Sequence, residues 1–396
     1  MSSTLDSVPS TAMQKLESMR SFGGALLTEG LPDAVVERFL DRDPTLVEAV
    51  DRAYALHESL RADFGELLRA DEADQVEQVQ ASIVNFYGHE LVNPYVSLAA
   101  SGPWIVTMKG AVLHDSGGYG MLGQGHTPPK ILEAMGRPQV MANVMTPNLS
   151  QMRLVRALKT EIGHNHHDDC PFTGFLFMNS GSESVTVAAR ISDINAKRMT
   201  DPGGRHEGKK IRRMALHGAF HGRTDRPAQF SDSSLKNYVA RMASFRDREP
   251  LLTVEPNNVA SLEKAFADAA ERNEFIEALF IEPVMGEGNP GVGVTRDFYD
   301  AARRLTAENG SLLLVDSIQA GLRTHGVLSI IDYPGFEDCV APDMETYSKA
   351  LNAGQYPLSV LAMTPAAAAL LVPGMYGNTM TSAPRGMDIG TAVLES

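Results

Sequence analysis

The sequence has very few cysteines and no long apolar run, and each absence excludes a class of protein. Only Cys170 and Cys339 occur among 396 residues, so a disulfide framework is excluded and a reducing, cytoplasmic compartment is expected. No run reaches the roughly 18 consecutive apolar residues of a membrane-spanning helix. No charged-then-apolar signal segment opens the chain. We therefore expect a cytoplasmic protein that makes no contact with a membrane.

An excess of positive charge is also missing. The chain holds 49 acidic and 35 basic residues, a formal net charge of −14, which disfavours a nucleic-acid-binding surface. Residues 1–100 hold 17 acidic and 7 basic residues, whereas the rest of the chain holds 32 and 28. The acidity is therefore mainly a property of the N-terminal part. Apolar residues make up 43% and charged residues 21%, which is ordinary for a globular protein.

The N-terminal part has a helical pattern. Between residues 31 and 84, apolar side chains recur at spacings of three and four, with acidic and basic residues between them. Asp43 and Pro44 suit the N-cap and first turn of one helix. We interpret residues 1–95 as an acidic helical extension. Beyond it, Trp104–Met108 and Ala111–His114 are expected to form a hairpin of two strands.

From about residue 172 onward, short apolar runs alternate with helical segments. The expected strands are Phe175–Met178, Ile211–Leu216, Ala278–Ile281 and Ser311–Val315. The expected helices are 182–199, Val259–Asn273 and Arg296–Asn309. This alternation predicts an α/β fold with a mostly parallel sheet flanked by helices on both faces. Ligands bind at the carboxyl ends of such strands, so functional residues should directly follow the apolar runs.

Two small-residue or aromatic loops follow the first two strands. Asn179–Glu183 leads straight into a helix, where free backbone N–H groups and the helix dipole favour phosphate; a simple N-capped helix is the alternative. His217–Thr224 combines the ring of Phe220, the imidazole of His221 and the guanidinium of Arg223 in a glycine-punctuated loop. An ordinary loop with incidental aromatic residues is the alternative there.

Acidic residues follow the next two strands, and one lysine follows later. Glu282 and Glu287 stand in a loop rich in glycine and proline, where they are acid–base groups, partners for an arginine, or solvated carboxylates. Asp316 directly follows a buried strand, where a carboxylate is costly without a cationic partner. Lys349 stands among small, neutral residues and is either an amine nucleophile or a surface lysine.

Taken together, these loops supply what pyridoxal phosphate needs from a protein. Its aldehyde needs a lysine, its pyridinium nitrogen a carboxylate, its phosphate N–H donors, and its ring a face on which to stack. All four groups follow strands of one predicted sheet. The combination is more informative than any single motif.

The chain resembles the class III pyridoxal-phosphate-dependent aminotransferases, the ornithine, acetylornithine and 4-aminobutyrate type of fold type I. The similarity runs from about Trp104 to Glu395. It rests on motifs in the family's order: Asp115–Gly120 with Gly125–His126, Asn179–Glu183, Phe220–Thr224, Glu282–Glu287, Asp316–Gln319, Ser348–Leu351 with Gly354 and Tyr356–Pro357, and Gly377–Thr379.

The resemblance implies a role for each residue of the cofactor site. Lys349 would form the Schiff base and move the proton, and Asp316 would pair with the pyridinium. The remaining cofactor-binding residues would be Gly181 and Ser182 at the phosphate, Phe220 and His221 in the ring-stacking motif, and Gln319 at the ring oxygen. Thr379 would reach the cofactor phosphate of a partner subunit, so a homodimer is implied. No metal is implied.

The resemblance also implies the substrate side of the reaction. Tyr119, Arg223, Glu282 and Glu287 would contact substrate, with Arg223 as the carboxylate-binding residue. The expected reaction moves an amino group from a small amino acid or ω-amine to a 2-oxo acid. The alternatives are a class III relative with aminomutase, racemase or decarboxylase activity, or a non-catalytic truncated homologue.

The resemblance divides the chain into four parts. After the extension, residues 96–145 would be the N-terminal part of a small domain with the substrate loop, and 146–376 the large cofactor-binding domain. Residues 377–396 would begin a C-terminal segment that is apparently truncated, because only 17 residues follow Thr379 and the family's C-terminal arginine has no counterpart. Other departures from the family pattern, which concern substrate identity, are Ser184, Val185, Thr186, Met285 and Ser317.

Three further patterns are interpreted as structural. Gly203–Lys209 has P-loop spacing, but Lys210 replaces the required hydroxyl residue, so a basic surface loop is expected. Gly118–Gly123 matches a dinucleotide fingerprint without the surrounding strand and helix. The run His164–Cys170 is rich in metal-ligand residue types but lacks paired spacing, so a solvated connection is expected instead of a zinc site.

Overall fold

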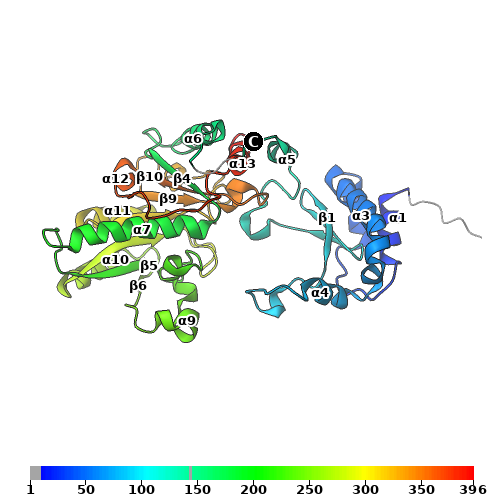
Figure 1. The fold of residues 1–396 in the computed structure, drawn as a ribbon, viewed down its shortest axis with the longest axis horizontal. Coiled ribbons are helices and arrows are strands. Elements are labelled where there is room, and N and C mark those ends of the chain that lie inside the picture. The colour runs from blue at the N-terminus through cyan, green and yellow to red at the C-terminus, as the bar shows by residue number, and fades with distance from the viewer. Residues whose placement is uncertain (1–9, 142–144) are drawn as a thin grey trace, which may run out of the picture. The chain divides into compact units, whose positions relative to one another are not determined.

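The structure is a computed structural model that describes residues 10–141 and 145–396. The chain forms two compact units (Figure 1). The first comprises Met1–Gly118 and Gln124–Pro129, and the second comprises Tyr119–Gly123 and Lys130–Ser396. Each unit is described by itself.

The first unit packs helices on a small antiparallel sheet. Its helices are α1 (Ala12–Arg20), α2 (Asp33–Leu40), α3 (Pro44–Arg69) and α4 (Glu72–Gln80), with the 3₁₀ turn η1 (His89–Leu91). Its strands, in sheet order, are β1 (Ser97–Ser101), β2 (Trp104–Thr107) and β3 (Val112–His114). The predicted hairpin is confirmed, because β2 and β3 pair antiparallel. The helical pattern at 31–84 forms three helices.

The start of α3 shows how local sequence specifies this unit. Asp43 is the N-cap, as predicted, and its carboxylate accepts from the Thr45 N–H at 3.0 Å. Pro44 occupies the first turn. The other oxygen of Asp43 accepts from the Trp104 indole at 2.8 Å, which ties the helix start to β2. Trp104 is 1% exposed in a core shared with α1, α2 and α3.

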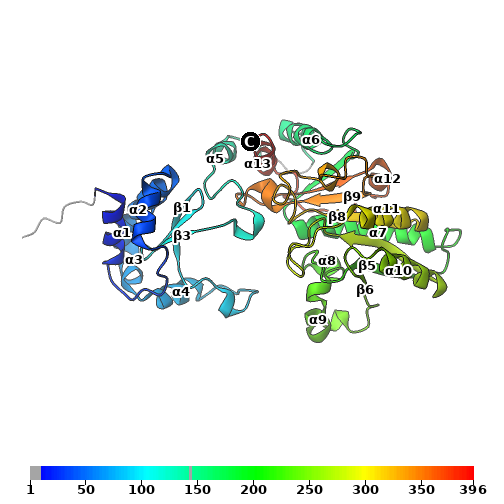
Figure 2. The same ribbon diagram turned by 180° about the vertical axis from the view of Figure 1, so that it is seen from behind.

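The second unit is built on a seven-stranded sheet (Figure 2). Its strands are β4 (Gly174–Met178), β5 (Lys210–Leu216), β6 (Leu252–Val254), β7 (Glu274–Ile281), β8 (Leu312–Asp316), β9 (Met344–Tyr347) and β10 (Ser359–Met363). The order across the sheet is β4-β10-β9-β8-β7-β5-β6. Strand β10 is antiparallel to β4 and β9, and the other neighbouring pairs are parallel. The mostly parallel sheet is therefore confirmed.

Helices cover both faces of this sheet, also as predicted. The longer helices of the unit are α5 (Pro129–Gly136), α6 (Leu149–Glu161), α7 (Gly181–Thr200), α9 (Asp232–Arg241), α10 (Val259–Glu271), α11 (Arg296–Asn309) and α13 (Pro384–Leu394). Short helical turns include η2 (Gly118–Gly120), α8 (Asp225–Ala228), η3 (Ala243–Phe245), η4 (Ile330–Asp332), η5 (Lys349–Asn352) and α12 (Pro365–Ala368).

Alternation along the strands separates two hydrophobic cores. Leu313 and Val315 of β8 join a core with α6, α10, α11 and α13, whereas Leu312 and Leu314 join a core with α7. Successive side chains of a strand point to opposite faces, so a strand buried on both faces reads as a continuous apolar run. Within the described residues, no helix is long and apolar enough to cross a bilayer.

Candidate active site

Five strand ends of the second unit surround one cavity, which we call the strand-end cavity. Its volume is about 180 Å³. The loops that line it follow β4, β5, β7, β8 and β9. The lining residues are Ser180, Gly181, Ser182, Phe220, His221, Gly222, Glu282, Asp316, Ile318, Gln319, Ser348 and Lys349. The structure thus brings together eight of the predicted site residues, although their roles stay predictions.

The first wall is the N-terminus of α7. Ser180 is its N-cap and accepts from the Glu183 N–H at 3.3 Å, while the Glu183 carboxylate accepts from the N–H groups of Asn179 (2.7 Å) and Ser180 (3.2 Å). These bonds leave the N–H groups of Gly181 and Ser182 at the open end of the helix. A Cβ atom at Gly181 would lie 2.5 Å from the Ile318 side chain, so glycine lets this turn approach the neighbouring loop. The arrangement suits an anion.

A buried Asp–His pair forms the floor. Asp316, at the end of β8, is 4% exposed, and its Oδ2 lies 2.9 Å from Nδ1 of His221. Its Oδ1 accepts from the Ile318 N–H at 3.2 Å. The Nε2 atom of His221 is buried and, among the described residues, has no hydrogen-bond partner. This pair holds a carboxylate in a fixed position where its charge is shielded from water.

Glu282 joins two loops of the site. Its Oε1 accepts from the Phe220 N–H and its Oε2 accepts from the Gly286 N–H, both at 2.9 Å. The side chain is 2% exposed, and burial raises the pKa of its carboxyl to about 7. Both carboxylate oxygens of Glu282 therefore accept hydrogen bonds from backbone N–H groups. The family resemblance had implied that Glu282 contacts substrate.

Lys349 projects from a strained turn after β9. Its backbone φ is +45°, in the left-handed region that residues other than glycine rarely adopt. The turn is held by Ser348 and Asn352, which both donate to the Leu358 carbonyl, at 2.7 and 3.0 Å. Burial lowers the pKa of the Lys349 ammonium, opposed by the charges of Asp316 and Glu287. Within the described part of the chain, its Nζ has no hydrogen-bond partner, so the amine is presented to the cavity.

The predicted substrate residues Arg223, Glu287 and Tyr119, and the predicted cofactor residue Thr379, lie outside the strand-end cavity wall or outside what the structure describes. Arg223 donates to Glu287 at 2.7 Å, and its guanidinium lies 5.3 Å from the centre of the Phe220 ring. Thr379 is exposed and does not line the strand-end cavity of its own chain. The side chain of Tyr119 lies outside what the structure describes.

Some residues around the site were not singled out from the sequence. Ser348 and Ile318 contribute to the cavity wall. Asn378 donates to Oε1 of Glu183 at 2.7 Å, which links the segment before Thr379 to the start of α7. In the sequence, the one sign of their importance is that they stand close to Lys349, Asp316 and Thr379. Which groups they contact depends on how distant segments fold together.

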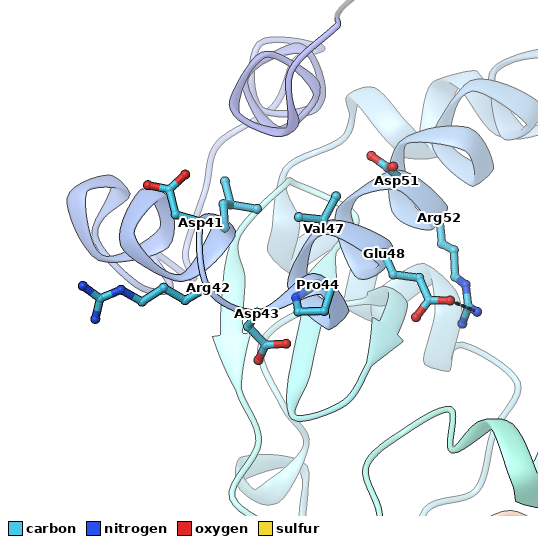
Figure 3. A pocket seen from close by; sticks show the side chains of 9 residues that line it. Asp41, Arg42, Asp43, Pro44, Val47, Glu48, Asp51 and Arg52 are labelled. Atoms are coloured by element: carbon cyan, nitrogen blue, oxygen red, sulfur yellow. Dashed lines mark hydrogen bonds and ion pairs between the residues drawn. The ribbon is translucent and has the colours of Figure 1, made fainter.

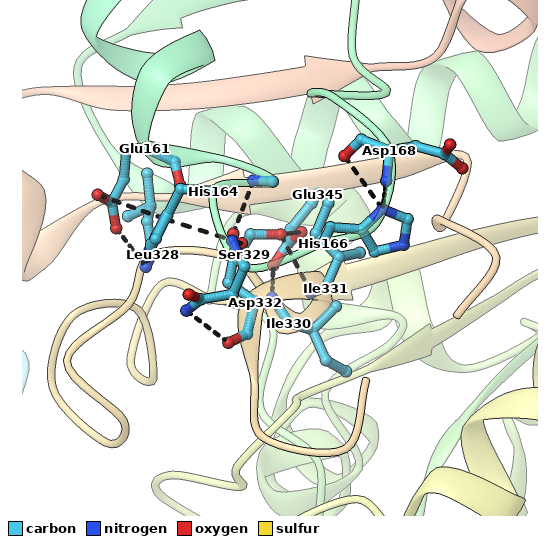
Figure 4. Close-up of polar contacts among 12 residues, drawn as sticks. Glu161, His164, His166, Asp168, Leu328, Ser329, Ile330, Ile331, Asp332 and Glu345 are labelled. Atoms are coloured by element: carbon cyan, nitrogen blue, oxygen red, sulfur yellow. Dashed lines mark hydrogen bonds and ion pairs between the residues drawn. The ribbon is translucent and has the colours of Figure 1, made fainter. Parts of the chain in front are cut away.

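The histidine-rich run takes part in loop packing (Figure 4). Asp332 accepts from the N–H groups of Gly163 and Asn165, both at 2.8 Å. Nε2 of His166 lies 2.9 Å from the Cys339 carbonyl. Among the described residues, no group of three or more His, Cys, Asp or Glu side chains is placed to hold a metal ion.

A hollow in the first unit is lined by charged residues, several of which pair with one another or with neighbouring side chains. It has a volume of about 490 Å³ and is lined by residues 40–44, 47, 48, 51 and 52 (Figure 3). Glu48 pairs with Arg52 and accepts from Ser101, and Asp51 pairs with Lys15. These contacts hold elements of the first unit together, and they do not indicate a catalytic or binding site.

The residues of the strand-end cavity fit pyridoxal phosphate. The start of α7 supplies N–H donors for a phosphate, Asp316 is a buried carboxylate held by His221, and Lys349 supplies an amine. Phe220 supplies an aromatic face. A glycine at 222 allows the loop to pass close to Ser182, since a Cβ there would lie 2.4 Å from the Ser182 Oγ.

Comparisons with known proteins identify the family of this chain. A family model described as Aminotransferase class-III matches residues 87–396. Ornithine aminotransferase of Staphylococcus epidermidis is 28% identical over 324 residues, which cover 79% of this chain and 74% of that protein. Ornithine aminotransferase 2 of Staphylococcus aureus (strain Mu50) is 28% identical over 323 residues, with the same coverage.

Solved structures share the fold. Ornithine aminotransferase from Toxoplasma gondii matches with a TM-score of 0.68 and 23% identity, over 85% of this chain and 74% of that chain. Acetylornithine aminotransferase from Elizabethkingia anophelis matches with a TM-score of 0.63 and 22% identity, over 82% and 73%. The predicted fold class is therefore confirmed.

Proposed function

Because this chain belongs to the class III aminotransferase family, whose members depend on pyridoxal phosphate, we propose that Lys349 is the residue to which the cofactor aldehyde binds. In this proposal the protein transfers an amino group from a small amino acid or ω-amine to a 2-oxo acid. The observation that carries the assignment is the meeting of Lys349, Asp316, Phe220 and the start of α7 around one cavity.

Each wall of the cavity has a distinct task in this proposal. When bound, pyridoxal phosphate supplies an electron-withdrawing ring that stabilises negative charge on the substrate carbon. The N–H groups of Gly181 and Ser182 bind phosphate. Asp316 holds a proton on the ring nitrogen, and His221 keeps the Asp316 carboxylate in place. Phe220 orients the ring by stacking, and Gln319 binds the ring oxygen.

Lys349 moves the proton in this proposal. Its amine carries a lowered pKa because of burial, so a larger fraction is in the neutral, basic form near neutral pH than for an exposed lysine. The free Nζ can accept a proton from the substrate carbon and return it to a neighbouring atom. The absence of a competing hydrogen bond within the described residues leaves this atom available.

The substrate class follows from the relatives and from the charged residues nearby. The relatives described above are named ornithine and acetylornithine aminotransferases, so amino acids with a distal amine are the first donors to test. Arg223 would bind a substrate carboxylate, with Glu287 either balancing its charge or contacting the amine. Tyr119 and Glu282 complete the proposed substrate-binding set.

We further propose a cytoplasmic homodimer in which Thr379 reaches the neighbouring site. Its support is the exposure of Thr379 and the bond from Asn378 to Glu183, which holds the adjoining residue near the phosphate-binding end of α7. The four-part division at residues 95, 145 and 376 is proposed on the same resemblance.

The test begins with covalent attachment. The protein is mixed with pyridoxal phosphate, reduced with borohydride and digested, and the labelled lysine is identified by mass spectrometry. Label at Lys349 and none at the fully buried Lys109 is expected. Label at another lysine, or none, contradicts the assignment of Lys349.

The second stage measures amino transfer. Ornithine, 4-aminobutyrate and simple amines are offered with 2-oxoglutarate or pyruvate, and the new amino acid is quantified. Transfer supports the proposal. Rearrangement, racemisation or carbon dioxide release without transfer would instead indicate an aminomutase, racemase or decarboxylase, and a labelled but inert protein would indicate a binding role.

A further inference from the structure

A second cavity lies beside the strand-end cavity in the same unit, and we call it the loop cavity. Its volume is about 360 Å³, and Gln319 lines both cavities. Its wall is formed by the loops after β7 and β8: residues 284–287, 290, 291, 319, 320, 323 and 324. The charged side chains of this wall are Glu287 and Arg323. The two cavities therefore adjoin at Gln319.

Glu287 has an ion-pair partner, whereas Arg323 has none among the described residues. Glu287 accepts from Arg223 at 2.7 Å. Within the described residues, no carboxylate lies within 4.0 Å of the Arg323 guanidinium. Arg323 is therefore the charged residue of this wall that has no ion-pair partner among the described residues. A planar guanidinium in this setting is suited to a carboxylate, which it can bind with two parallel hydrogen bonds.

Arg323 is exposed, but one side of its side chain packs against a neighbouring segment. A Cβ atom at Gly120 would lie 2.8 Å from both Cδ and Nη1 of Arg323, so the guanidinium rests against this glycine. Two residues further on, Leu122 packs on Gly354 in the turn that follows Lys349. The segment Tyr119–Gly123 therefore contacts both the guanidinium and the turn of the lysine. Arg323 also lowers the pKa of Lys349, opposite to Glu287, which places its charge within electrostatic range of the amine.

We propose that Arg323 binds the substrate carboxylate at the end remote from the reacting amino group, in the loop cavity. The inference rests on the proposed function, and it assigns a role to a residue that the sequence motifs did not single out. In this proposal Arg323 takes the carboxylate-binding role that the resemblance implies for Arg223, because Arg223 is paired with Glu287 and lies near the Phe220 ring, whereas Arg323 has no carboxylate partner among the described residues. Substrates with a carboxylate at that end are then preferred over plain amines.

The first test measures equilibrium binding and needs no turnover. Glutarate, a dicarboxylate that cannot accept an amino group, is titrated by calorimetry into protein saturated with pyridoxal phosphate. Because hydrogen bonds to charged groups contribute about 1.5–3 kcal/mol, Arg323→Met should weaken glutarate binding roughly tenfold to a hundredfold, and Arg323→Lys should weaken it less. Arg304→Met is the matched control, since Arg304 is exposed and pairs with Glu263, away from both cavities, and it should not change the affinity.

The second test separates carboxylate binding from a structural role through Gly120. When the amino donor is 5-aminopentanoate, Arg323→Met should raise the Michaelis constant, and when the donor is pentylamine the constant should be unchanged. An equal loss for both substrates overturns the proposal, as does no binding of glutarate by the wild-type protein, or a loss of glutarate binding in Arg223→Met but not in Arg323→Met. Normal glutarate binding in a protein that transfers no amino group would instead count against the proposed function alone.

Discussion

Lys109 in the first unit and Lys349 in the second are both lysines whose pKa burial lowers, yet their ammonium groups have different surroundings. Lys109 is 1% exposed and donates to the carbonyls of Gly23 and Leu68. Lys349 is partly exposed and faces the strand-end cavity without a hydrogen-bond partner among the described residues. Burial by itself therefore does not mark a reactive lysine.

The acidic residues show the same difference. In the first unit, the fully buried Glu72 accepts from the N–H groups of Leu27 and Thr28, both at 2.7 Å, and so fixes a loop. In the second unit, Asp316 lies against His221 with its carboxylate at a cavity wall. Glu72 therefore stabilises the fold, whereas Asp316 is placed to meet a ligand. The following predictions test this contrast.

The largest expected effect is on turnover in Lys349→Ala. Positioned proton transfer contributes typically about 10²- to 10⁴-fold, so kcat should fall by about 10³-fold or more. The unfolding free energy should be unchanged or higher, because the Lys349 ammonium makes no hydrogen bond within the described residues and a partly desolvated charge is removed. Assays of amino transfer measure kcat, and urea titrations measure the unfolding free energy. A variant that is inactive because it is strongly destabilised would contradict the contrast.

The next effect is a pH dependence at Glu345, a buried acid of β9. Its Oε1 accepts from the Ile330 N–H at 3.0 Å and its Oε2 from Ser329 at 2.5 Å (Figure 4). Its Oε1 also accepts from Ser317 at 2.5 Å. Burial raises the pKa of Glu345 to about 7. Since the folded pKa is above the unfolded one, this contribution is complete below the unfolded pKa and is lost as pH rises through about 7.

Glu345→Gln should remove that pH dependence. At about 1.36 kcal/mol per pH unit between the two pKa values, the wild type should lose roughly 3 kcal/mol relative to the variant between about pH 4.5 and pH 9. Urea titrations followed by circular dichroism at several pH values measure it. Glu271→Gln, at an exposed position, is the control. If the unfolding free energy changes with pH in the same way in all three proteins, the raised pKa does not belong to Glu345.

A smaller effect is expected for Lys109→Met in the first unit. The change keeps the length of the side chain but leaves the Gly23 carbonyl without this donor, at a cost of about 2 kcal/mol. Trp104 is the sole tryptophan of the chain and lies in the core of this unit, so its fluorescence during urea unfolding is the readout. Labelling of Lys349 by pyridoxal phosphate should be unaffected; its loss would mean that Lys109 also acts at the cofactor site.

The sequence predicts those parts of the second unit whose physical cause is local. The apolar runs of β7 and β8 and the polar residues directly after them were predictable, because a strand buried on both faces has a continuous apolar sequence. Strand β9 was not predictable in this way, since it carries Glu345 and Thr346 in its interior. The hydroxyl groups that satisfy Glu345 come from Ser317 and Ser329, which are distant in the sequence.

The site divides in the same manner. The turn before α7 was predictable from a short segment, whereas the motif around Lys349 was identified through the family resemblance. That both oxygens of Glu282 bind backbone, and that Arg323 faces a cavity next to Gln319, depends on how loops from different strands meet. Periodicity and spacing carry no information about such contacts between distant segments.

The smallest effect compares one local motif in the two units. Thr11 and Ser180 begin capping boxes with Gln14 and Glu183, and each hydroxyl accepts from the N–H three residues on, at 3.2 and 3.3 Å. Replacing either hydroxyl by alanine should cost about 1 kcal/mol of stability. Only Ser180→Ala should also weaken the binding of pyridoxal phosphate, because the N–H groups of the next two residues face the strand-end cavity.

The readouts are urea unfolding and a titration of cofactor absorbance. Ser180→Thr should restore cofactor affinity, because threonine also caps helices. Equal affinities in Thr11→Ala and Ser180→Ala would mean that the start of α7 does not bind the phosphate. A lower affinity for pyridoxal phosphate in Ser180→Ala alone would instead show that the capping box stabilises the helix in the first unit and also supports ligand binding in the second.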